Sequence, residues 1–193
     1  MLELVTAVIS LFVSNDRAKE RLRVVDSDSD AEFTSLIKAA TAAVEKETGR
    51  ILQPSKWKYF TDCWEIEIPA YPVRTILSVN YLDEDHIEQT IAPENYYWHS
   101  TSSGAVIHFI TDYNFPTLSD RDRSINVVFE AGYDDVGSGS GDDPNLIIPP
   151  TVELCILFLV GHWYESREAG NENQNYEVPK TFEFLASQLR IYR

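Results

Sequence analysis

Hydrophobic residues recur at helical spacing in two stretches near the start of the chain. In the longer stretch, from Asp28 to Gly49, they follow one another three or four positions apart, which places them on one face of a helix. Asp and Ser residues before this stretch suit a helix N-cap, and Gly49 suits the position just after a helix. The sequence therefore predicts a long helix here and a shorter one at about residues 15–24. The residues expected to face the core are Phe33, Leu36, Ile37, Ala40, Ala43 and Val44 in the longer helix and Ala18, Leu22 and Val25 in the shorter one.

The pattern changes after Gly49 to short runs of aromatic and β-branched residues. Each run is bounded by Pro, Gly, Asp or Asn, which is typical of strands joined by tight turns. They predict an antiparallel β-subdomain over roughly residues 56–133. The Gly-, Ser- and Asp-rich segment 134–148 is then expected to be a flexible loop. The predicted strand runs are "WKYFTDCWEIEIPA", "RTILSVNYLDED", "ENYYWHS", "GAVIHFITDY" and "RSINVVFEAGY".

Two more helices are predicted after this loop. Residues 149–168 begin with two prolines, which suit a first helical turn, and continue with a nearly apolar run, so this helix is expected to be central and buried. Residues 178–193 place apolar side chains at spacings of three to four and predict a C-terminal helix or tail. Because strands and helices do not alternate, the predicted fold class is α+β. We expect a single domain, 1–193, in which a small helical bundle (15–50, 149–168 and 178–193) carries an inserted antiparallel β-subdomain.

The chain is strongly acidic, and the excess is concentrated in its middle. It has 193 residues, of which 31 are acidic and 16 are basic, for a net charge of −15. Residues 51–150 contain 16 acids and 5 bases, a balance of −11. Such a surface repels phosphate, so the sequence argues against a groove that grips nucleic acid. The charge fits simple solubility, and it also fits a protein past which DNA slides without sticking.

The cysteines and the apolar segments indicate no special compartment. Cys63 and Cys155 are far apart and in no CxxC pattern, so neither a disulfide framework nor a zinc site is expected. The first thirteen residues carry Glu3 and no basic cluster, which is unlike a secretion signal. The run "LCILFLV" (154–160) is far shorter than the ~20 residues that span a bilayer. We therefore expect no membrane association.

The stretch "GHWYESREAG" (161–170) holds the most suggestive cluster of polar side chains. His162, Glu165 and Glu168 are three residues apart, a spacing that places them on neighbouring helical turns, as in carboxylate-bridged metal proteins. Such sites need a second copy of the motif on another helix, and the sequence contains none. A helix that leaves the core also exchanges apolar for charged side chains at this point. We therefore predict no catalytic, metal-binding or cofactor-binding residues.

Other patterns that are similar to known sites fail in an essential position. The segment "DSDSDAE" begins like a calcium loop but has Ala31 where that loop needs Gly and Ile37 where it needs Glu, so it is interpreted as a helix cap. The segment "GSGSG" lacks the Lys of a phosphate-binding loop and is flanked by Asp residues. No Ser–His–Asp order typical of a hydrolase occurs. His86, His99 and His108 share no motif and are interpreted as surface or hydrogen-bonded residues.

Aromatic residues of the predicted strands leave one alternative function open. They would form a sugar-stacking platform if they shared one exposed face, although aromatic residues in short strands more often pack in a core or an interface. A carbohydrate-binding module is therefore one alternative, and a metal-dependent hydrolase that uses His162 and Glu165 is another. The aromatic residues concerned are Trp57, Tyr59, Trp64, Tyr96, Tyr97 and Trp98.

Four strings in order along the chain, "ETGR", "PV..I.SV.Y.D", "F.AGY" and "HWYE.RE", resemble the head–tail connector, or head-completion adaptor, proteins of long-tailed bacteriophages and gene transfer agents. The likeness covers most of the chain. The resemblance implies a non-enzymatic virion subunit that forms a ring between the portal protein and the tail, continues the DNA channel and offers the tail a docking platform. The Ser/Gly-rich loop at 134–145 and the apolar first thirteen residues have no place in this pattern.

The same resemblance implies the partners and the location of the protein. It implies a homo-oligomeric ring, expected to be a dodecamer, that contacts the portal protein on one side. On the other side it implies a tail-side stopper or tail-terminator protein, with double-stranded DNA passing through the lumen without specific binding. The protein is expected at the head–tail interface of the virion after synthesis in the bacterial cytoplasm, with no cofactor and no membrane partner.

The C-terminal helix is the candidate portal-docking segment, because chain ends dock on portal in related connectors. Its apolar face could instead pack on the other helices of its own subunit, as amphipathic terminal helices usually do. The two alternatives remain open at this point. The candidate docking residues are Phe182, Leu185, Leu189, Arg190, Tyr192 and Arg193.

Overall fold

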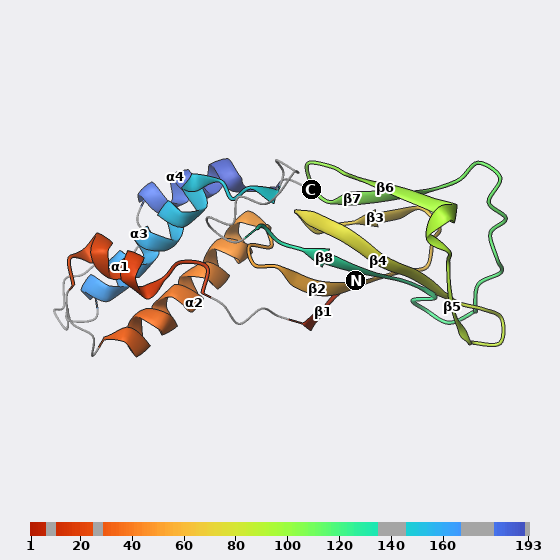
Figure 1. The fold of residues 1–193 in the computed structure, drawn as a ribbon, viewed down its shortest axis with the longest axis horizontal. Coiled ribbons are helices and arrows are strands. Elements are labelled where there is room, and N and C mark those ends of the chain that lie inside the picture. The colour runs from red at the N-terminus through yellow and green to blue at the C-terminus, as the bar shows by residue number, and fades with distance from the viewer. Residues whose placement is uncertain (7–10, 25–28, 135–145, 167–179, 192–193) are drawn as a thin grey trace. The chain divides into compact units, whose positions relative to one another are not determined.

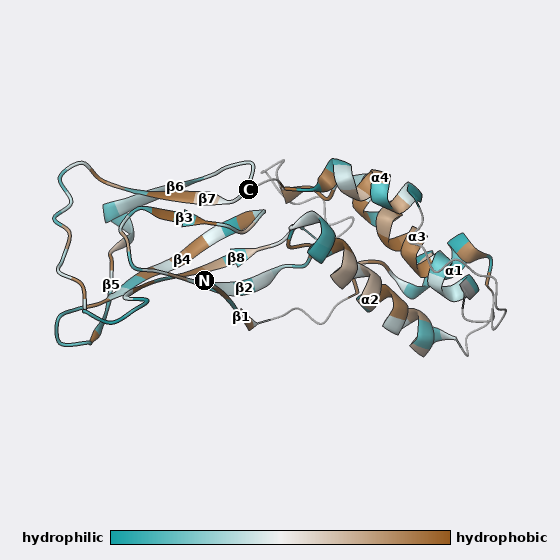
Figure 2. Cartoon of the chain, turned by 180° about the vertical axis from the view of Figure 1, so that it is seen from behind, coloured by the Kyte–Doolittle hydropathy of each residue, from teal (hydrophilic) through white to brown (hydrophobic). Residues whose placement is uncertain are grey.

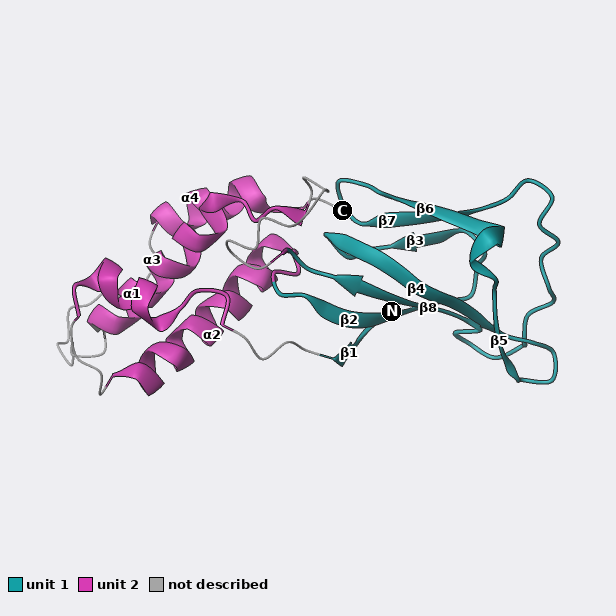
Figure 3. Ribbon diagram, in the orientation of Figure 1, with its two compact units in different colours: residues 1–8, 53–133, 193 teal, residues 9–52, 134–192 magenta. Residues whose placement is uncertain are grey.

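The chain divides into two compact units, which Figure 3 shows in different colours. Unit 1 comprises residues 1–8, 53–133 and 193, and unit 2 comprises residues 9–52 and 134–192. The described strands all belong to unit 1, and the described α-helices all belong to unit 2. Helices together with two antiparallel sheets confirm the predicted α+β fold class. The computed structural model describes residues 1–6, 11–24, 29–134, 146–166 and 180–191.

Unit 2 is a helical bundle built around the third helix of the chain. This helix, α3, contacts each of the other described α-helices, as Figure 1 shows. Its residues are hydrophobic along most of its length (Figure 2), and Cys155, Ile156 and Val160 are fully buried. The helix is therefore central, as predicted, although Leu154 on one side of it remains exposed. The helices are α1 (Asn15–Leu22), α2 (Asp30–Thr48), α3 (Pro150–Ser166) and α4 (Lys180–Leu189).

Helix α2 presents the predicted apolar face to the core and ends as its sequence indicates. Phe33, Ile37, Ala40 and Val44 are fully buried, which follows from their spacing of three and four residues. Gly49 terminates the helix with φ of 72°, a left-handed conformation that costs glycine little. At the other end, the side chain of the N-cap residue makes no capping hydrogen bond, so the predicted side-chain cap is absent there.

The described residues of unit 1 form two antiparallel sheets. The larger sheet has the strand order β1-β2-β8-β4-β5, and the smaller one has the order β3-β7-β6. The middle strands of the larger sheet bury Val79, Ile125, Val127 and Phe129 on one face, with no exposed surface on any of the four. The strands are β1 (Leu2–Thr6), β2 (Ser55–Thr61), β3 (Ile66–Ile68), β4 (Val73–Leu82), β5 (Glu88–Thr90), β6 (Tyr96–Ser100), β7 (Ala105–Phe109) and β8 (Ile125–Ala131).

The start of the chain contributes a strand that the sequence patterns did not predict. Strand β1 pairs antiparallel with β2, so that Leu2 lies opposite Tyr59 and Leu4 lies opposite Trp57. The β-rich unit is therefore not a simple insertion between helices, because its outermost strand comes from the N-terminal segment. Among the described residues, no helix is long and apolar enough to cross a lipid bilayer.

Candidate functional site

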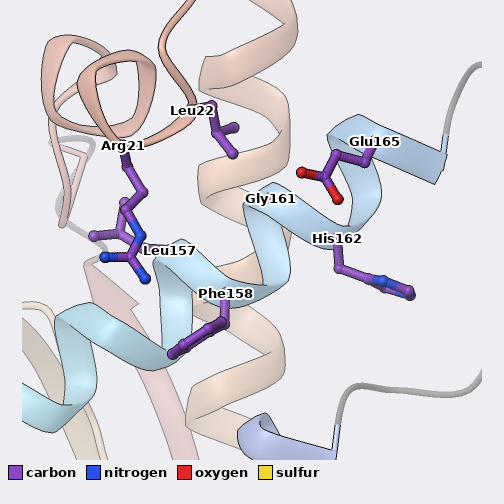
Figure 4. Close-up of a pocket in the computed structure, with 7 residues that line it drawn as sticks. All are labelled: Arg21, Leu22, Leu157, Phe158, Gly161, His162 and Glu165. Carbon is purple, nitrogen blue, oxygen red and sulfur yellow. The ribbon is translucent and has the colours of Figure 1, made fainter.

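The polar stretch at the end of α3 borders a pocket within unit 2. His162 is half-buried and Glu165 is exposed, and in Figure 4 the imidazole and the carboxylate point in different directions. Glu168 lies outside the described residues. Among the residues that the structure describes, no three His, Cys, Asp or Glu side chains are grouped so that they could hold a metal ion. The pocket has a volume of about 370 Å³ and is lined by Arg21, Leu22, Leu157, Phe158, Gly161, His162 and Glu165.

Two other residues of this stretch, Tyr164 and Gly161, lie at contacts between helices. The Tyr164 ring stacks on Phe33 of α2, with ring centroids 4.8 Å apart. Gly161 gives α1 room to approach, because a Cβ atom at this position would lie 3.2 Å from a methyl carbon of Leu22. These contacts support the interpretation of "HWYE" as a packing motif at the end of the central helix.

The two cysteines lie in different environments. Cys155 is buried in α3, and desolvation raises the pKa of its thiol to about 11. A thiol with so high a pKa is almost entirely protonated at neutral pH and is a poor nucleophile. Cys63 is exposed in unit 1 and is a free thiol.

The string "ETGR" forms a connection between the C-terminal ends of α2 and α4. Glu47 forms an ion pair with Arg190, and the Thr48 carbonyl oxygen accepts a hydrogen bond of 2.9 Å from the Ile191 amide. The guanidinium Nε of Arg50 donates to the carbonyl oxygen of Leu189 at 2.6 Å. The Gly49 conformation that ends α2 turns the chain at this point. The string is thus explained by one local task, which is to hold the end of α4 against α2.

The other two strings of the resemblance also have structural roles. In "F.AGY", Phe129, Ala131 and Tyr133 are buried with no more than 1% of their surface exposed. In "PV..I.SV.Y.D", the last residue is Asp83, whose Oδ1 accepts hydrogen bonds from the Asp85 and Ile87 amides. This side chain therefore closes the turn between β4 and β5.

The structure places the candidate docking residues of the C-terminal segment in different environments. Phe182 and Leu189 are each 6% exposed and pack within unit 2, and Leu185 is half-buried. Arg190 is engaged with Glu47, through both the carboxylate and the backbone carbonyl oxygen. Tyr192 and Arg193 lie outside the described residues. The neighbouring Phe184, which the sequence did not single out, is 63% exposed on the opposite side of α4.

The strand aromatics do not form one exposed platform. Trp57 and Tyr59 share a face of β2, whereas Trp64 contacts Phe109 and Phe115 in a separate cluster of rings. Trp98 and Tyr97 are consecutive in β6 and therefore project from opposite faces of the smaller sheet. The fold therefore does not bring all six aromatic residues together on one sugar-stacking surface.

Two of the histidines that share no sequence motif are in contact. Strands β6 and β7 bring the rings of His99 and His108 into a stack with centroids 5.0 Å apart, and Tyr97 stacks on His108 at 5.2 Å. The sequence interpretation missed this cluster because it depends on the register of the two strands, in which His99 lies opposite Val106. The signal in the sequence that could have indicated this cluster was the alternation of side chains within each strand.

Tertiary structure also brings His86 near Ser119 and Asp120, an arrangement that no sequence order indicated. The His86 Nδ1 atom lies 2.6 Å from the Ser119 hydroxyl, and its Nε2 atom lies 3.9 Å from an Asp120 carboxylate oxygen. The Ser119 hydroxyl also accepts a hydrogen bond from the Arg121 amide, and the Ser119 amide donates to the Leu82 carbonyl oxygen. These bonds join two loops of unit 1, and we interpret the group as structural.

Three solved structures of gene transfer agent (GTA) particles contain chains of similar fold, and each match covers 100% of this chain and 96% of the other. The chain in the neck of an empty GTA particle, with C6 symmetry, has a TM-score of 0.74 and 20% identity. The chain in the virion of a native GTA particle has a TM-score of 0.71 and 21% identity. The chain in the neck of a native GTA particle, with C12 symmetry, has a TM-score of 0.68 and 20% identity.

These similarities define the class of fold to which the chain belongs. Its whole length has the fold of a chain found in gene transfer agent particles, including their necks. No protein-family profile matches the sequence, and no curated protein matches it.

Proposed function

We propose that this protein is a non-enzymatic structural subunit of the neck of a phage-like particle, where copies of it form a ring between portal and tail. The observation that carries the proposal is the full-length similarity to a chain of the GTA neck. The C6 and C12 symmetries of those necks support repeated copies around one axis, and twelve is the expected number. The described residues of the four resemblance strings are interpreted as packing and turn residues, which agrees with a structural role.

The charge of unit 1 supports passage of DNA without adhesion. The described part of this unit, residues 1–6 and 53–133, contains 13 acidic and 5 basic residues, a balance of −8. Repeated around a ring, this charge repels the phosphate backbone. We expect the purified protein to bind duplex DNA weakly at physiological salt and more weakly still as salt is lowered, in a gel-shift titration. Tight binding that salt weakens would contradict a role as a DNA channel.

The ring itself is tested by measuring mass with and without portal protein. We expect the isolated subunit to be monomeric or weakly associated, because its charge opposes self-association, and to assemble on the portal of the same particle. Native mass spectrometry or electron microscopy of the mixture should show a ring of defined copy number. A closed dimer at every concentration, with no affinity for portal, would contradict the proposal.

We place the portal contact on the C-terminal segment, with the tail-side stopper or terminator on the opposite end of the ring. Since Phe182 and Leu189 are buried, the contact is expected to use the exposed side of α4, which carries Phe184, together with the chain end. Truncation after Glu177 removes buried side chains as well and therefore tests folding first. The sharper variant is Phe184→Ser, which should abolish joining to portal-filled heads while the melting curve stays unchanged. Joining by this variant at the normal level would place the portal contact elsewhere.

A further inference from the structure

Strand β1 is an open edge of the larger sheet, and it exposes the apolar Leu4 and Val5 beside Glu3 and Thr6. It pairs with β2 on one side, and the structure pairs none of the described strands with its other side. Leu4 is 47% exposed and Val5 is 51% exposed. Open apolar edges are sites of strand addition unless something covers them. A register shift after Leu4 interrupts the pairing with β2, so the regular part of the edge is Leu2–Leu4.

Strand β6 is the matching open edge of the smaller sheet. It also has five residues, pairs with β7 alone among the described strands, and carries Tyr97, which is 59% exposed. In Figure 1 the two strands lie at opposite edges of unit 1. A contact between β1 of one copy and β6 of another therefore leaves a free β6 and a free β1, so it can repeat from copy to copy around a ring.

The backbone alternation of the two strands is compatible with such a pair. Met1 and Phe60 exchange both backbone hydrogen bonds, so the N–H and C=O groups of Leu2 and Leu4 point away from β2. In β6, the Thr101 amide donates to the Gly104 carbonyl and the Ile110 amide donates to the Asn95 carbonyl. By the same alternation, the backbone groups of Tyr96, Trp98 and Ser100 point toward the open edge.

The side chains of those residues also match. Leu4 lies on the face of the larger sheet that includes Trp57 and the buried Phe129. Trp98 lies on the face of the smaller sheet that includes the buried Ile107. Pairing Leu4 with Trp98 therefore continues an apolar face into an apolar face.

Charge distinguishes strand β6 from the other edge strands described in the unit. Strand β6 contains no acid, whereas Glu3 lies in β1, Glu67 in β3 and Glu88 in β5. A contact between β6 and any one of these edges therefore places one strand carboxylate between two copies of this acidic chain, whereas a contact between two of the others places two there. An antiparallel register with Leu4 opposite Trp98 also puts Glu3 opposite His99, so that the carboxylate meets an imidazole.

We propose that the β1 edge of one copy adds antiparallel to the β6 edge of the next copy, with Leu4 opposite Trp98. The partner is a second copy of this chain, and the pairing forms the contact between neighbouring subunits. The proposal rests on the ring of the proposed function and specifies which surfaces close it.

A cysteine pair tests the register directly. In this register Glu3 and His99 form a non-hydrogen-bonded pair, in which Cα atoms are about 4.5 Å apart and a disulfide can form. We expect the variant Glu3→Cys/His99→Cys, in a Cys63→Ser background, to give a covalent ladder of oligomers after mild oxidation. The experiment is done on portal-assembled protein and on concentrated free subunit, and the ladder in either sample supports the proposal. The control variant Glu3→Cys/Gln89→Cys uses the β5 edge and should give no ladder.

A second variant tests the backbone hydrogen bonds of the proposed strand pair. Leu4→Pro removes an amide that points away from β2, so the subunit should fold with the wild-type melting curve. Its assembly should be weaker by on the order of tenfold at each contact, because one intermolecular hydrogen bond and one apolar contact are lost. The control variant Ile87→Ser changes an exposed apolar residue in the turn between β4 and β5, away from the proposed contact, and should assemble normally.

The two levels of the hypothesis fail in different ways. Rings on portal, with no Glu3→Cys/His99→Cys ladder in either sample, overturn the strand pairing and leave the neck function intact. A ladder in free subunit that never binds portal supports the pairing and contradicts the neck function. Absence of the ladder in both samples overturns the pairing.

Discussion

Arg50, two residues beyond the end of α2, donates a hydrogen bond of 2.6 Å from its Nε to the carbonyl oxygen of Leu189, the last residue of α4. The last carbonyl groups of a helix have no partner within the helix, so this guanidinium supplies one from another part of the chain. Residues 139 positions apart in sequence are thereby joined at one corner of the helical unit.

We expect Arg50→Ala to lower the free energy of unfolding by about 1–2 kcal/mol, because a hydrogen bond from a charged donor to a helix end is lost. The measurement is urea unfolding followed by circular dichroism. Lys46→Ala, which changes an exposed cation in the last turn of the same helix, should shift the value by less than about 0.5 kcal/mol. Equal effects of both variants would show that the bond to Leu189 contributes nothing specific.

Gly161 is a packing position, and its substitutions should separate by size. In Gly161→Ala the new Cβ makes a tight contact of 3.2 Å with a flexible methyl group of Leu22, which lowers stability. The better helix propensity of Ala raises stability by about 1 kcal/mol. Because the two effects oppose each other, the free energy of unfolding should change little. Gly161→Leu should lower it by about 1–3 kcal/mol through overpacking of α1 against α3. Thermal melts of both variants check this order, and a stable Gly161→Leu protein would contradict the close packing.

Phe182 and Phe184 form a matched pair on α4. Phe182 is 6% exposed and Phe184 is 63% exposed. Phe182→Ala should therefore lower the free energy of unfolding by about 3 kcal/mol through loss of buried area and a cavity. Phe184→Ala should change it by less than about 0.5 kcal/mol. Chemical denaturation of the two variants measures the difference, and similar losses would mean that α4 packs through a different face.

The carboxylate of Asp83 should make the β4–β5 turn sensitive to acid. Hydrogen bonds from Gln89 and from the Ile87 amide lower the pKa of this side chain below its usual value. The charged form is thus favoured by folding, so its contribution is present above the unfolded-state pKa and is lost as the pH falls through the folded-state pKa. In Asp83→Asn, the amide nitrogen of the new side chain cannot accept the hydrogen bond that Gln89 donates to the Asp83 carboxylate. Wild type should therefore exceed this variant in stability at neutral pH, and the difference should shrink as the pH falls through the folded-state pKa of Asp83.

The chemical shift of the Asp83 carboxyl carbon during an acid titration provides an independent check. A midpoint at or above that of an unstructured Asp would contradict the assigned hydrogen bonds.

Local pattern in the sequence was sufficient for most elements of the fold. The apolar spacing from Phe33 to Val44 predicted the buried face of α2, and Gly49 predicted its end, because both depend on residues within a few positions of one another. The short β-branched runs between Pro, Gly and Asp likewise predicted antiparallel strands after residue 55. The absence of a second histidine–carboxylate motif argued against a metal site at His162 from the sequence alone.

Tertiary structure decided which of these elements meet. Nothing near Leu4 in the sequence indicates that it lies opposite Trp57, since the pairing joins segments more than fifty residues apart. The stack of His99 on His108 depends on the register of two strands, and the bond from Arg50 to Leu189 depends on how α4 docks on α2. Propensity and periodicity act over a few residues, whereas strand order, register and helix docking are set by burial over the whole chain. For that reason the sequence could define the helices and strands of this protein, and only the assembled structure could show which of its edges remain open.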